Sequence, residues 1–201
     1  MIKTWYKLGM VLFCWLWGAV ACAAGPVAVL QTAANQMIAA LAAHQSQLSS
    51  HPKLVNQIVR QNVVPYVDVN RMGGLVVGRA NWMSATPSQR AQFISAFTEL
   101  VINTYAAAFA SYDGDQVMFY PLRTQPTNVA HVDSVIVRKN GQRIAISYDM
   151  NTVGGNWRIY DFSIEGVSIV QNYQSQFAST LANGGMPVLI TRLQAYGKAN
   201  S

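Results

Sequence analysis

The side chains that could perform chemistry are few in this sequence and lie far apart. Cys14 and Cys22 are the two cysteines, and both fall within residues 1–23, a segment that is predicted to be cleaved from the exported domain. The three histidines, His44, His51 and His131, are widely separated, and none has a second histidine or a carboxylate at metal-ligand spacing on a helix face. The sequence therefore predicts no thiol nucleophile, no metal site and no bound cofactor.

One histidine has a carboxylate close to it in the chain. His131 and Asp133 share a face of a predicted strand, as a general base and the group that orients it would. A solvated strand edge explains the same spacing without any chemistry. We therefore expect a structural role for this pair.

Two more carboxylates lie near the end of a later strand. Asp161 and Glu165 are the nearest approach to the paired acids of a hydrolase. Gly166 interrupts the strand beside them, so we expect Glu165 to bind backbone amides at that junction. If the protein were an enzyme, it would be a small hydrolase or isomerase that uses Asp161 and Tyr148, with Asp149 as a further candidate.

The glycine pairs do not match a phosphate-binding loop, and the basic residues do not match a nucleic-acid site. The pairs at 73–74, 154–155 and 184–185 lack the following Lys and Ser or Thr of a phosphate loop, and they are typical of turns and helix ends. The longest basic pair, Arg138-Lys139, stands beside a turn. Because no stripe of basic residues alternates with aromatic ones, the sequence predicts no nucleic-acid partner.

The N-terminus has the pattern of a secretory signal. Lys3 and Lys7 lead into an apolar stretch over residues 8–20, which is shorter than the roughly 20 residues of a membrane-spanning helix. Small residues at 21–23 form a cleavage site, so residues 1–23 are predicted to be a signal peptide and 24–201 the exported domain. The alternative is a weak lipoprotein box at 19–22, which would place a lipid on Cys22.

The mature chain has the size of one domain that must rely on its core. It has 178 residues and no cysteine, so no disulfide supports it. Lys3 and Lys7 leave with the leader, and the remaining 12 Lys and Arg face 8 Asp and Glu. This mild positive excess is compatible with anionic membrane surfaces. No other segment is expected to span a membrane.

Helical spacing of apolar residues predicts four helices in the first half of the chain. The clearest start is at 86–89, where Thr86 can cap, Pro87 takes the first helical position and Gln89 the third. A shorter helix has Asp68 as its cap and a weak point at Gly73-Gly74. The predicted helices cover residues 27–47, 52 to just before Pro65, 68–75 and 87–111.

The second half changes from helical spacing to alternation, which predicts strands. Asn140-Gly141 and residues 154–156 separate these runs as hairpin turns. Two helices close the chain, one over 169–183 and one after Pro187. The predicted strands are 116–120, 129–137, 143–150 and 157–164. The sequence thus predicts an α+β fold, with a curved antiparallel sheet of about four strands and helices on one face.

The sequence has many apolar and aromatic residues to which none of the candidate sites above assigns a role. A curved sheet crossed by a helix can leave a cavity between them, and these residues would line it. The alternative is a structural binding module with an ordinary packed core and no cavity. The side chains expected to line a cavity are Tyr66, Val69, Leu75, Phe97, Val101, Tyr105, Ile136, Ile146, Tyr148, Trp157 and Val167.

Several segments also resemble a known family. They are residues 64–69 (VPYVDV), 74–78 (GLVVG), 84–90 (SATPSQR) and 155–168 (GNWRIYDFSIEGVS), together with Phe97 and Tyr105. In this order they resemble the MlaC family, the periplasmic phospholipid-binding component of the Mla lipid-transport system, also described as a toluene-tolerance auxiliary component. The likeness spans about residues 30 to 195.

The resemblance implies a fold and a function. It implies an NTF2-like α+β fold whose apolar cavity holds the acyl chains of a phospholipid while the headgroup stays exposed. It implies a periplasmic monomer that shuttles lipid between the outer and inner membranes and so maintains outer-membrane lipid asymmetry. The implied partners are an outer-membrane lipoprotein–porin complex and an inner-membrane ABC transporter with a substrate-binding ring. No catalytic residue is implied.

Overall fold

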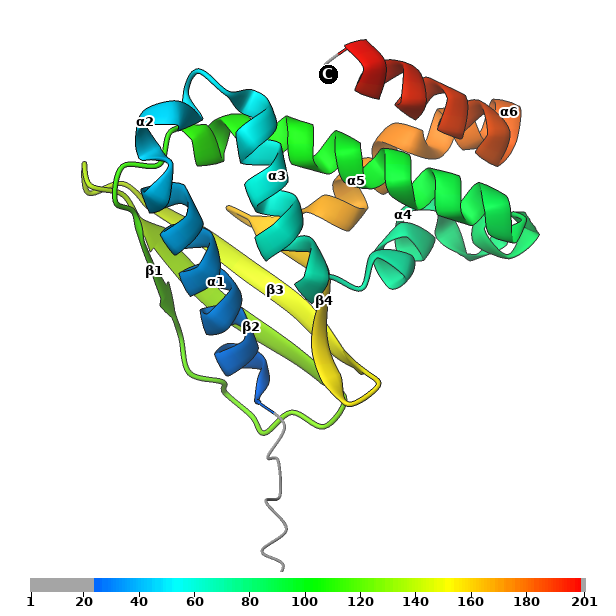
Figure 1. The fold of residues 1–201 in the computed structure, drawn as a ribbon. Helices are drawn as coiled ribbons and strands as arrows, with labels where there is room; N and C mark the ends of the chain where they lie inside the picture. The colour runs from blue at the N-terminus through cyan, green and yellow to red at the C-terminus, as the bar shows by residue number, and fades with distance from the viewer. Residues whose placement is uncertain (1–23, 200–201) are drawn as a thin grey trace, which may run out of the picture.

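The computed structural model describes residues 24–199, so the predicted signal peptide at 1–23 lies outside the described residues. Helices come first, then a sheet, then a long closing helix (Figure 1). The helices are α1 (Pro26–Ala43), α2 (Gln45–Leu48), α3 (Pro52–Asn62), the 3-10 helix η1 (Val64–Tyr66), α4 (Val69–Ser84), α5 (Pro87–Ala110) and α6 (Ile169–Ala199).

The strands form one antiparallel sheet in the order β1-β2-β3-β4-β5. The predicted α+β class is confirmed, and the sheet has five strands because a two-residue strand follows the four expected ones. Gly141 takes a φ of 84° in the predicted turn between β2 and β3. The strands are β1 (Gln116–Phe119), β2 (Val129–Val137), β3 (Arg143–Val153), β4 (Asn156–Ile164) and β5 (Val167–Ser168).

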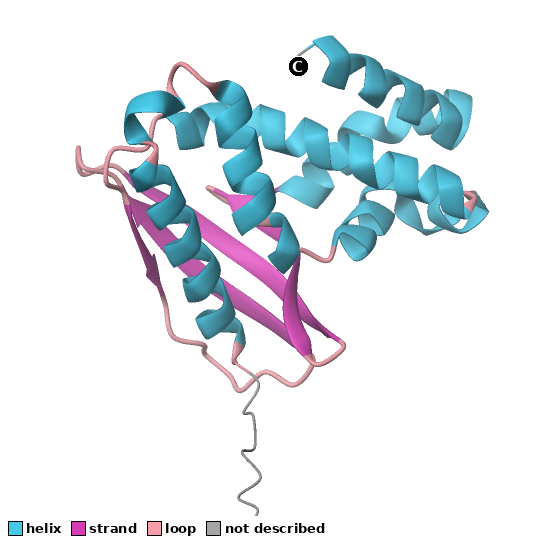
Figure 2. Cartoon of the chain, in the orientation of Figure 1, coloured by secondary structure: helices cyan, strands magenta, loops and turns pink. Residues whose placement is uncertain are grey.

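The helices give the sheet an inner and an outer face. Figure 2 shows α1 and α3 over one face of the strands, with α4, α5 and α6 grouped beside them. The register pairs Val132 with Tyr148 and Tyr148 with Phe162. Because side chains alternate along a strand, these three share the inner face, while His131, Asp149 and their neighbours share the outer one.

The predicted start of α5 is confirmed in detail. Gln89 N–H donates to Thr86 Oγ1 at 3.2 Å, and Thr86 N–H donates to Gln89 Oε1 at 2.9 Å. This capping box satisfies two backbone donors that the helix cannot pair internally, and is worth about 1 kcal/mol. It fixes where α5 begins and therefore which of its residues face the sheet.

The third predicted helix, over residues 68–75, is longer in the structure than predicted. Residues 69–84 form α4, and the break is at Gly78, with φ 77° and ψ 154°, instead of at Gly73-Gly74. Gly73 stays helical, and a Cβ there would stand 2.4 Å from Ile94 Cδ1 of α5. The glycine at 73 thus allows close helix packing, and Gly78 is the one that turns the chain.

The closing region behaves as predicted. The helix α6 runs from Ile169 to Ala199, but Gly185 within it has φ 62° and ψ −164°, so the backbone changes direction there. Pro187 follows the break, where a proline fits the start of a new helical segment. Two helical segments therefore close the chain, as their composition indicated.

Two helices of the domain are long and apolar in composition. By length and composition alone, α1 and α5 could each cross a membrane. Core helices of soluble proteins meet the same criterion, but only 22% of each apolar window is buried. In both helices the large hydrophobic side chains are buried or half-buried, and none is exposed.

Candidate functional site

The apolar interior is divided into three clusters. The helical cluster joins α4, α5 and α6 around Phe93, Phe97 and Phe177. The roof cluster joins α1, α2, α3 and α5 around Val55 and Ile102. The sheet cluster packs Leu30 of α1 against the strands; its buried members are Leu30, Val132, Met150, Trp157 and Ile159.

The inner face of the sheet is packed at one end and not at the other. Val132, Met150 and Ile159 are 1%, 0% and 5% exposed, and we call this end the closed half. Toward the β2–β3 hairpin the side chains become half-buried, although they remain apolar and inward-facing. We call this set the open half; it consists of Val117, Ile136, Ile144 and Ile164.

The open half lacks the packing that its composition would allow. Val117, Ile136 and Ile144 belong to none of the three clusters, nor does the neighbouring Ile146. Conversely, the roof cluster contains no strand residue within the part of the chain that the structure describes. Interior apolar side chains normally touch many neighbours. Ile164 packs against the helical cluster, and the other side chains of the open half face a layer, between the sheet and the roof cluster, that belongs to none of the three clusters.

The end of α5 confines this layer from the side. Tyr105 meets Phe162 of β4 edge to face, with ring centroids 6.3 Å apart. Val101, one turn earlier, is half-buried against the helical cluster. Burial raises the pKa of the Tyr105 phenol, and the nearby Tyr173 adds to the shift. Both α5 side chains thus stand at the boundary between packed helices and the open half.

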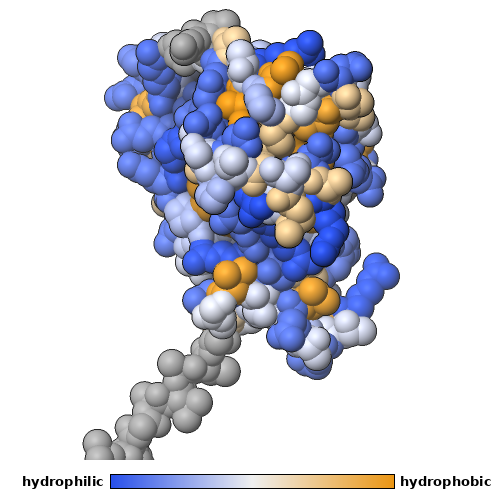
Figure 3. Space-filling view, turned by 90° about the vertical axis from the view of Figure 1, so that its right-hand side faces the viewer, coloured by the Kyte–Doolittle hydropathy of each residue, from blue (hydrophilic) through white to orange (hydrophobic). Residues whose placement is uncertain are grey.

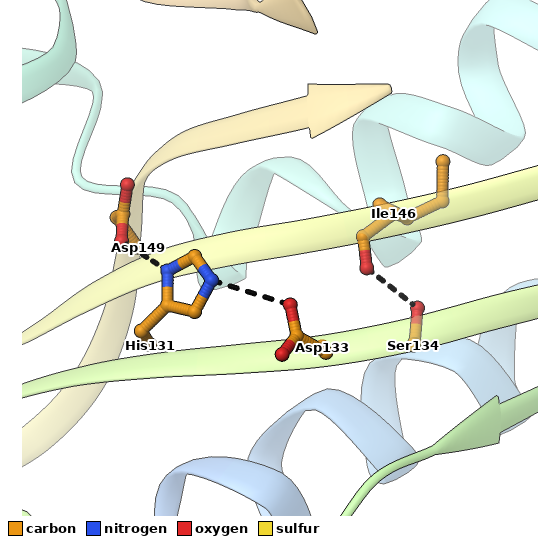
Figure 4. A network of polar contacts seen from close by, with 5 residues as sticks. All are labelled: His131, Asp133, Ser134, Ile146 and Asp149. Carbon is orange, nitrogen blue, oxygen red and sulfur yellow. Dashed lines mark hydrogen bonds and ion pairs between the residues drawn. The ribbon is translucent and has the colours of Figure 1, made fainter. Parts of the chain in front are cut away.

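Tyr148 marks the boundary between the two halves of the sheet. Its ring lies 6.1 Å from that of Phe119, and burial raises the pKa of its phenol against the opposing effect of a hydrogen bond with Ser134. Ser134 is itself buried and donates to the Ile146 carbonyl at 3.3 Å (Figure 4). Despite this enclosure Tyr148 stays half-buried.

The structure brings five of the eleven predicted residues to this region. Val101 and Tyr105 come from α5, and Ile136, Ile146 and Tyr148 come from the inner face of β2 and β3. Two more, Phe97 and Trp157, are buried members of the helical and sheet clusters. Phe97 packs among the helices, and Trp157 lies with the closed half, at the end of the sheet away from the β2–β3 hairpin.

The other four predicted residues lie elsewhere. Tyr66 donates to Gln36 Oε1 at 2.9 Å and so joins η1 to α1, and Val69 begins α4. Leu75 is 41% exposed because α4 turns its other side, with Val76, to the core. Val167 is 56% exposed in the short strand β5. Leu75 therefore does not face the inner layer, and Val167, although it pairs with Ile164 of the inner face, is mostly exposed at the sheet edge.

Two small clefts lie away from the sheet. One of about 300 Å³ runs between α4 and α6, lined by Val76, Asn81 and Leu181 among others, and one of about 150 Å³ lies at the bend of α6. Figure 3 shows this side of the molecule with apolar patches set among hydrophilic residues. A cleft of 300 Å³ is at the lower limit for a small ligand. None of the eleven predicted residues lines either cleft.

The carboxylates do not form an enzyme site. Asp161 accepts hydrogen bonds from Ser168 Oγ at 2.5 Å and from Val170 N–H at 3.1 Å, so it holds the start of α6. Its neighbour Phe162 pairs with Tyr148, which places Asp161 and Tyr148 on opposite faces of the sheet. Glu165 accepts from Ala145 N–H, as expected of a backbone contact.

The histidine pair is a solvated network on the outer face. His131 Nδ1 lies 2.7 Å from Asp149 Oδ1, and Nε2 lies 3.2 Å from Asp133 Oδ1 (Figure 4). The hydrogen bond with Asp149 raises the pKa of His131 most, with the charges of both carboxylates adding to it. All three side chains are well exposed. Among the described residues no group of three or more His, Cys, Asp or Glu could hold a metal ion.

The comparison with protein families decides between the remaining interpretations. The family model described as MlaC protein matches residues 31–195. The chain belongs to the MlaC family. The resemblance predicted from the sequence is therefore confirmed, over the same span.

Curated relatives agree with the family. The chain is 28% identical over 199 residues to the intermembrane phospholipid transport system binding protein MlaC of Haemophilus influenzae, covering 96% of this chain and 92% of that protein. It is 22% identical over 160 residues to the toluene tolerance protein ttg2D of Pseudomonas putida, covering 80% and 74%.

A solved structure has the same fold. The phospholipid-binding protein from Ralstonia solanacearum, in complex with a phospholipid, superposes with a TM-score of 0.81 at 29% identity. The match covers 88% of this chain and 98% of that one. The MlaC fold, with helices on one face of an open antiparallel sheet, therefore extends through nearly all of the domain described above.

Sequence reasoning missed part of the inner layer of this MlaC-family chain. Ile144, Phe162 and Ile164 face inward beside the predicted residues but were not among the eleven. The available signal was the register: a short turn at Asn140-Gly141 sets which residues of β2 and β3 lie opposite each other. Alternation alone gives two faces without telling which one is covered.

Proposed function

We propose that this protein carries phospholipid through the periplasm, with the acyl chains held between the open half of the sheet and the roof cluster. The observation that supports this most is that Ile136 and Ile144 are apolar, inward-facing and half-buried, yet join none of the three packed clusters. As a member of the MlaC family, the chain is a phospholipid-binding carrier of intermembrane phospholipid transport and not an enzyme.

The energetics of acyl chains explain why such a layer is useful. Each methylene removed from water contributes about 0.8 kcal/mol, so one chain of about 16 carbons represents roughly 13 kcal/mol. A lipid that crosses water unprotected faces nearly this whole cost. An apolar layer open to a guest removes this cost.

The same layer would permit release. Its walls are mainly aliphatic and aromatic, and Ser134 already donates its hydroxyl proton to the Ile146 carbonyl. Contacts of this kind are non-directional, so affinity scales with the area covered and not with one strong polar anchor. A carrier has to pass its ligand on to a partner, and this requires an affinity that the partner can match.

The partners and the route follow from the family role. The proposed donor or acceptor at one membrane is an outer-membrane lipoprotein–porin complex, and at the other an inner-membrane ABC transporter with its substrate-binding ring. Residues 1–23 would direct export and be removed, leaving 24–201 as a monomeric domain. Transport of this kind would maintain the lipid asymmetry of the outer membrane.

Lipid analysis of the native protein tests the proposal. The full chain is expressed so that it is exported, purified without detergent, and analysed by mass spectrometry before and after denaturation. We expect a phospholipid adduct that is lost on unfolding. If independent preparations carry no lipid, and delipidated protein takes up none from added phospholipid, the protein is not a lipid carrier.

A further inference from the structure

Arg138 lies where the apolar inner face of the sheet ends. It follows β2 directly, and its backbone closes the hairpin through Arg138 N–H to the Gln142 carbonyl and Gly141 N–H to the Arg138 carbonyl, both 2.9 Å. Alternation from Ile136 points the Arg138 side chain to the inner face. Its Nη2 reaches Ser111 Oγ, at the end of α5, at 3.3 Å, which agrees with that direction.

The charge of Arg138 has no ion-pair partner among the described residues. No carboxylate of the described residues lies within 4.0 Å of its guanidinium, whereas Arg60 pairs with Glu99 and Lys139 with Asp113. Arg138 is half-buried, and its Nε is fully buried without a hydrogen-bond partner. A desolvated cation without a counter-charge is unfavourable. The position is therefore suited to an anion that arrives from outside.

The unused donors have a defined geometry. Nε–H and the neighbouring Nη2 hydrogen form one edge of the planar guanidinium, and this edge matches two oxygens of a phosphate. At present Nε has no acceptor, and Nη2 has only the neutral hydroxyl of Ser111 at a long distance. A phosphate would give both donors a charged acceptor.

We propose that Arg138 binds the phosphate group of the lipid whose acyl chains cover the open half. The inference rests on the proposed function, because it needs the chains to lie over Ile136 and Ile144, the residues beside Arg138 on the inner face. The contact selects for the phosphodiester that all glycerophospholipids share and leaves the rest of the headgroup free. Lipids with neutral or anionic headgroups would therefore bind alike, whereas a lipid without phosphate would lose this contact.

The same hairpin provides a matched control. Arg143 pairs with Val137 in the register and so points to the outer face. Arg143→Gln changes the net charge by the same amount as Arg138→Gln, on the opposite strand of the hairpin, without touching the inner layer. Lys139 is less suitable because it already pairs with Asp113 at 3.4 Å.

The test compares two lipids that differ only in their phosphate-containing headgroup. Delipidated full-length mature protein is titrated with dipalmitoyl phosphatidylethanolamine and with dipalmitoylglycerol, which has the same chains and no phosphate. Arg138→Gln is expected to weaken phosphatidylethanolamine binding by about tenfold or more, since hydrogen bonds to charged groups are the strong ones, and to leave dipalmitoylglycerol unchanged. Arg143→Gln is expected to change neither.

Other outcomes overturn the inference in distinguishable ways. Equal weakening for both lipids assigns Arg138 to the fold of the hairpin, and unchanged phosphatidylethanolamine binding removes it from the site. If Arg138→Gln does not fold, Arg138→Lys keeps the charge but loses the two-donor edge; it should weaken only phosphatidylethanolamine, by several-fold, and no loss contradicts the inference. A wild-type protein that binds neither lipid instead overturns the proposed function itself.

Discussion

The two halves of the inner sheet face are made of similar residues and differ in what covers them. In the closed half, Val132 and Met150 pack against Leu30 of α1 and are almost completely buried. In the open half, Ile136 and Ile144 face inward in the same strands but join no cluster. Hydrophobic patterning therefore builds both a core and a binding layer, and the position of the helices above decides which one results.

The largest expected effect concerns stability in the closed half. Met150→Ala removes a fully buried side chain and should lower the free energy of unfolding by about 2–5 kcal/mol. Ile144→Ala, in the open half, should cost under about 1 kcal/mol in delipidated protein, because few contacts are lost. Urea unfolding of both variants measures the difference. Equal costs would show that the two halves are packed alike.

Filling the open half should separate binding from stability. Val101→Trp adds a large side chain beside the layer over the open half, so it should lower phospholipid occupancy at least severalfold. The free energy of unfolding should change by less than about 1 kcal/mol, whereas the same enlargement in a packed core costs about 1–3 kcal/mol. Native mass spectrometry measures occupancy. Val153→Trp, at an exposed position of β3, is the control that should keep its lipid. Unchanged occupancy in Val101→Trp would remove Val101 from the binding layer.

Tyr148 should show a smaller effect, because it stands between the two halves. Tyr148→Phe removes a hydroxyl whose surroundings are desolvated, and should change the free energy of unfolding by no more than about 1.5 kcal/mol. Lipid occupancy should persist because the ring remains. Calorimetric melting and lipid extraction test this together. Loss of lipid with unchanged melting would instead assign the hydroxyl to direct lipid binding.

The outer face should give the smallest effect. The raised pKa of His131 means that its pairing with Asp149 stabilises the fold at low pH, below about 6.5, and that this contribution is lost as pH rises through the raised value. Because the pair is exposed, the contribution should stay under about 1 kcal/mol. Wild type and His131→Gln are compared by urea unfolding at about pH 5.5 and about pH 9, on either side of the ordinary histidine pKa. A difference that is larger at the higher pH would contradict the sign, and lipid loss in His131→Gln would connect the outer face to binding.

The local signals in the sequence predicted the elements well. The cap at Thr86, the turn at Asn140-Gly141 and the alternating strands each depend on residues near one another in the chain, and each stands where it was predicted. Gly78 shows the limit of such signals. Whether a glycine bends a helix or allows close packing is decided by what faces it, and Ile94 settles this for Gly73.

The site was harder to predict because it depends on which face the helices cover. Leu75 and Val167 are apolar residues at the surface, and no local pattern separates them from Ile136. The role inferred for Arg138 was not visible at all, since a basic residue beside a turn normally points to solvent. Its inward direction follows from the register and from its contact with Ser111 on a distant helix.

Photo-cross-linking tests the central claim most directly. A phospholipid with a photoreactive group in one acyl chain is loaded into the delipidated protein, irradiated, and located by peptide mass mapping. The account predicts labels in β2 and β3 around Ile136 and Ile144, and in α5 around Val101 and Tyr105. Labels confined to the cleft between α4 and α6, around Val76 and Leu181, would contradict it.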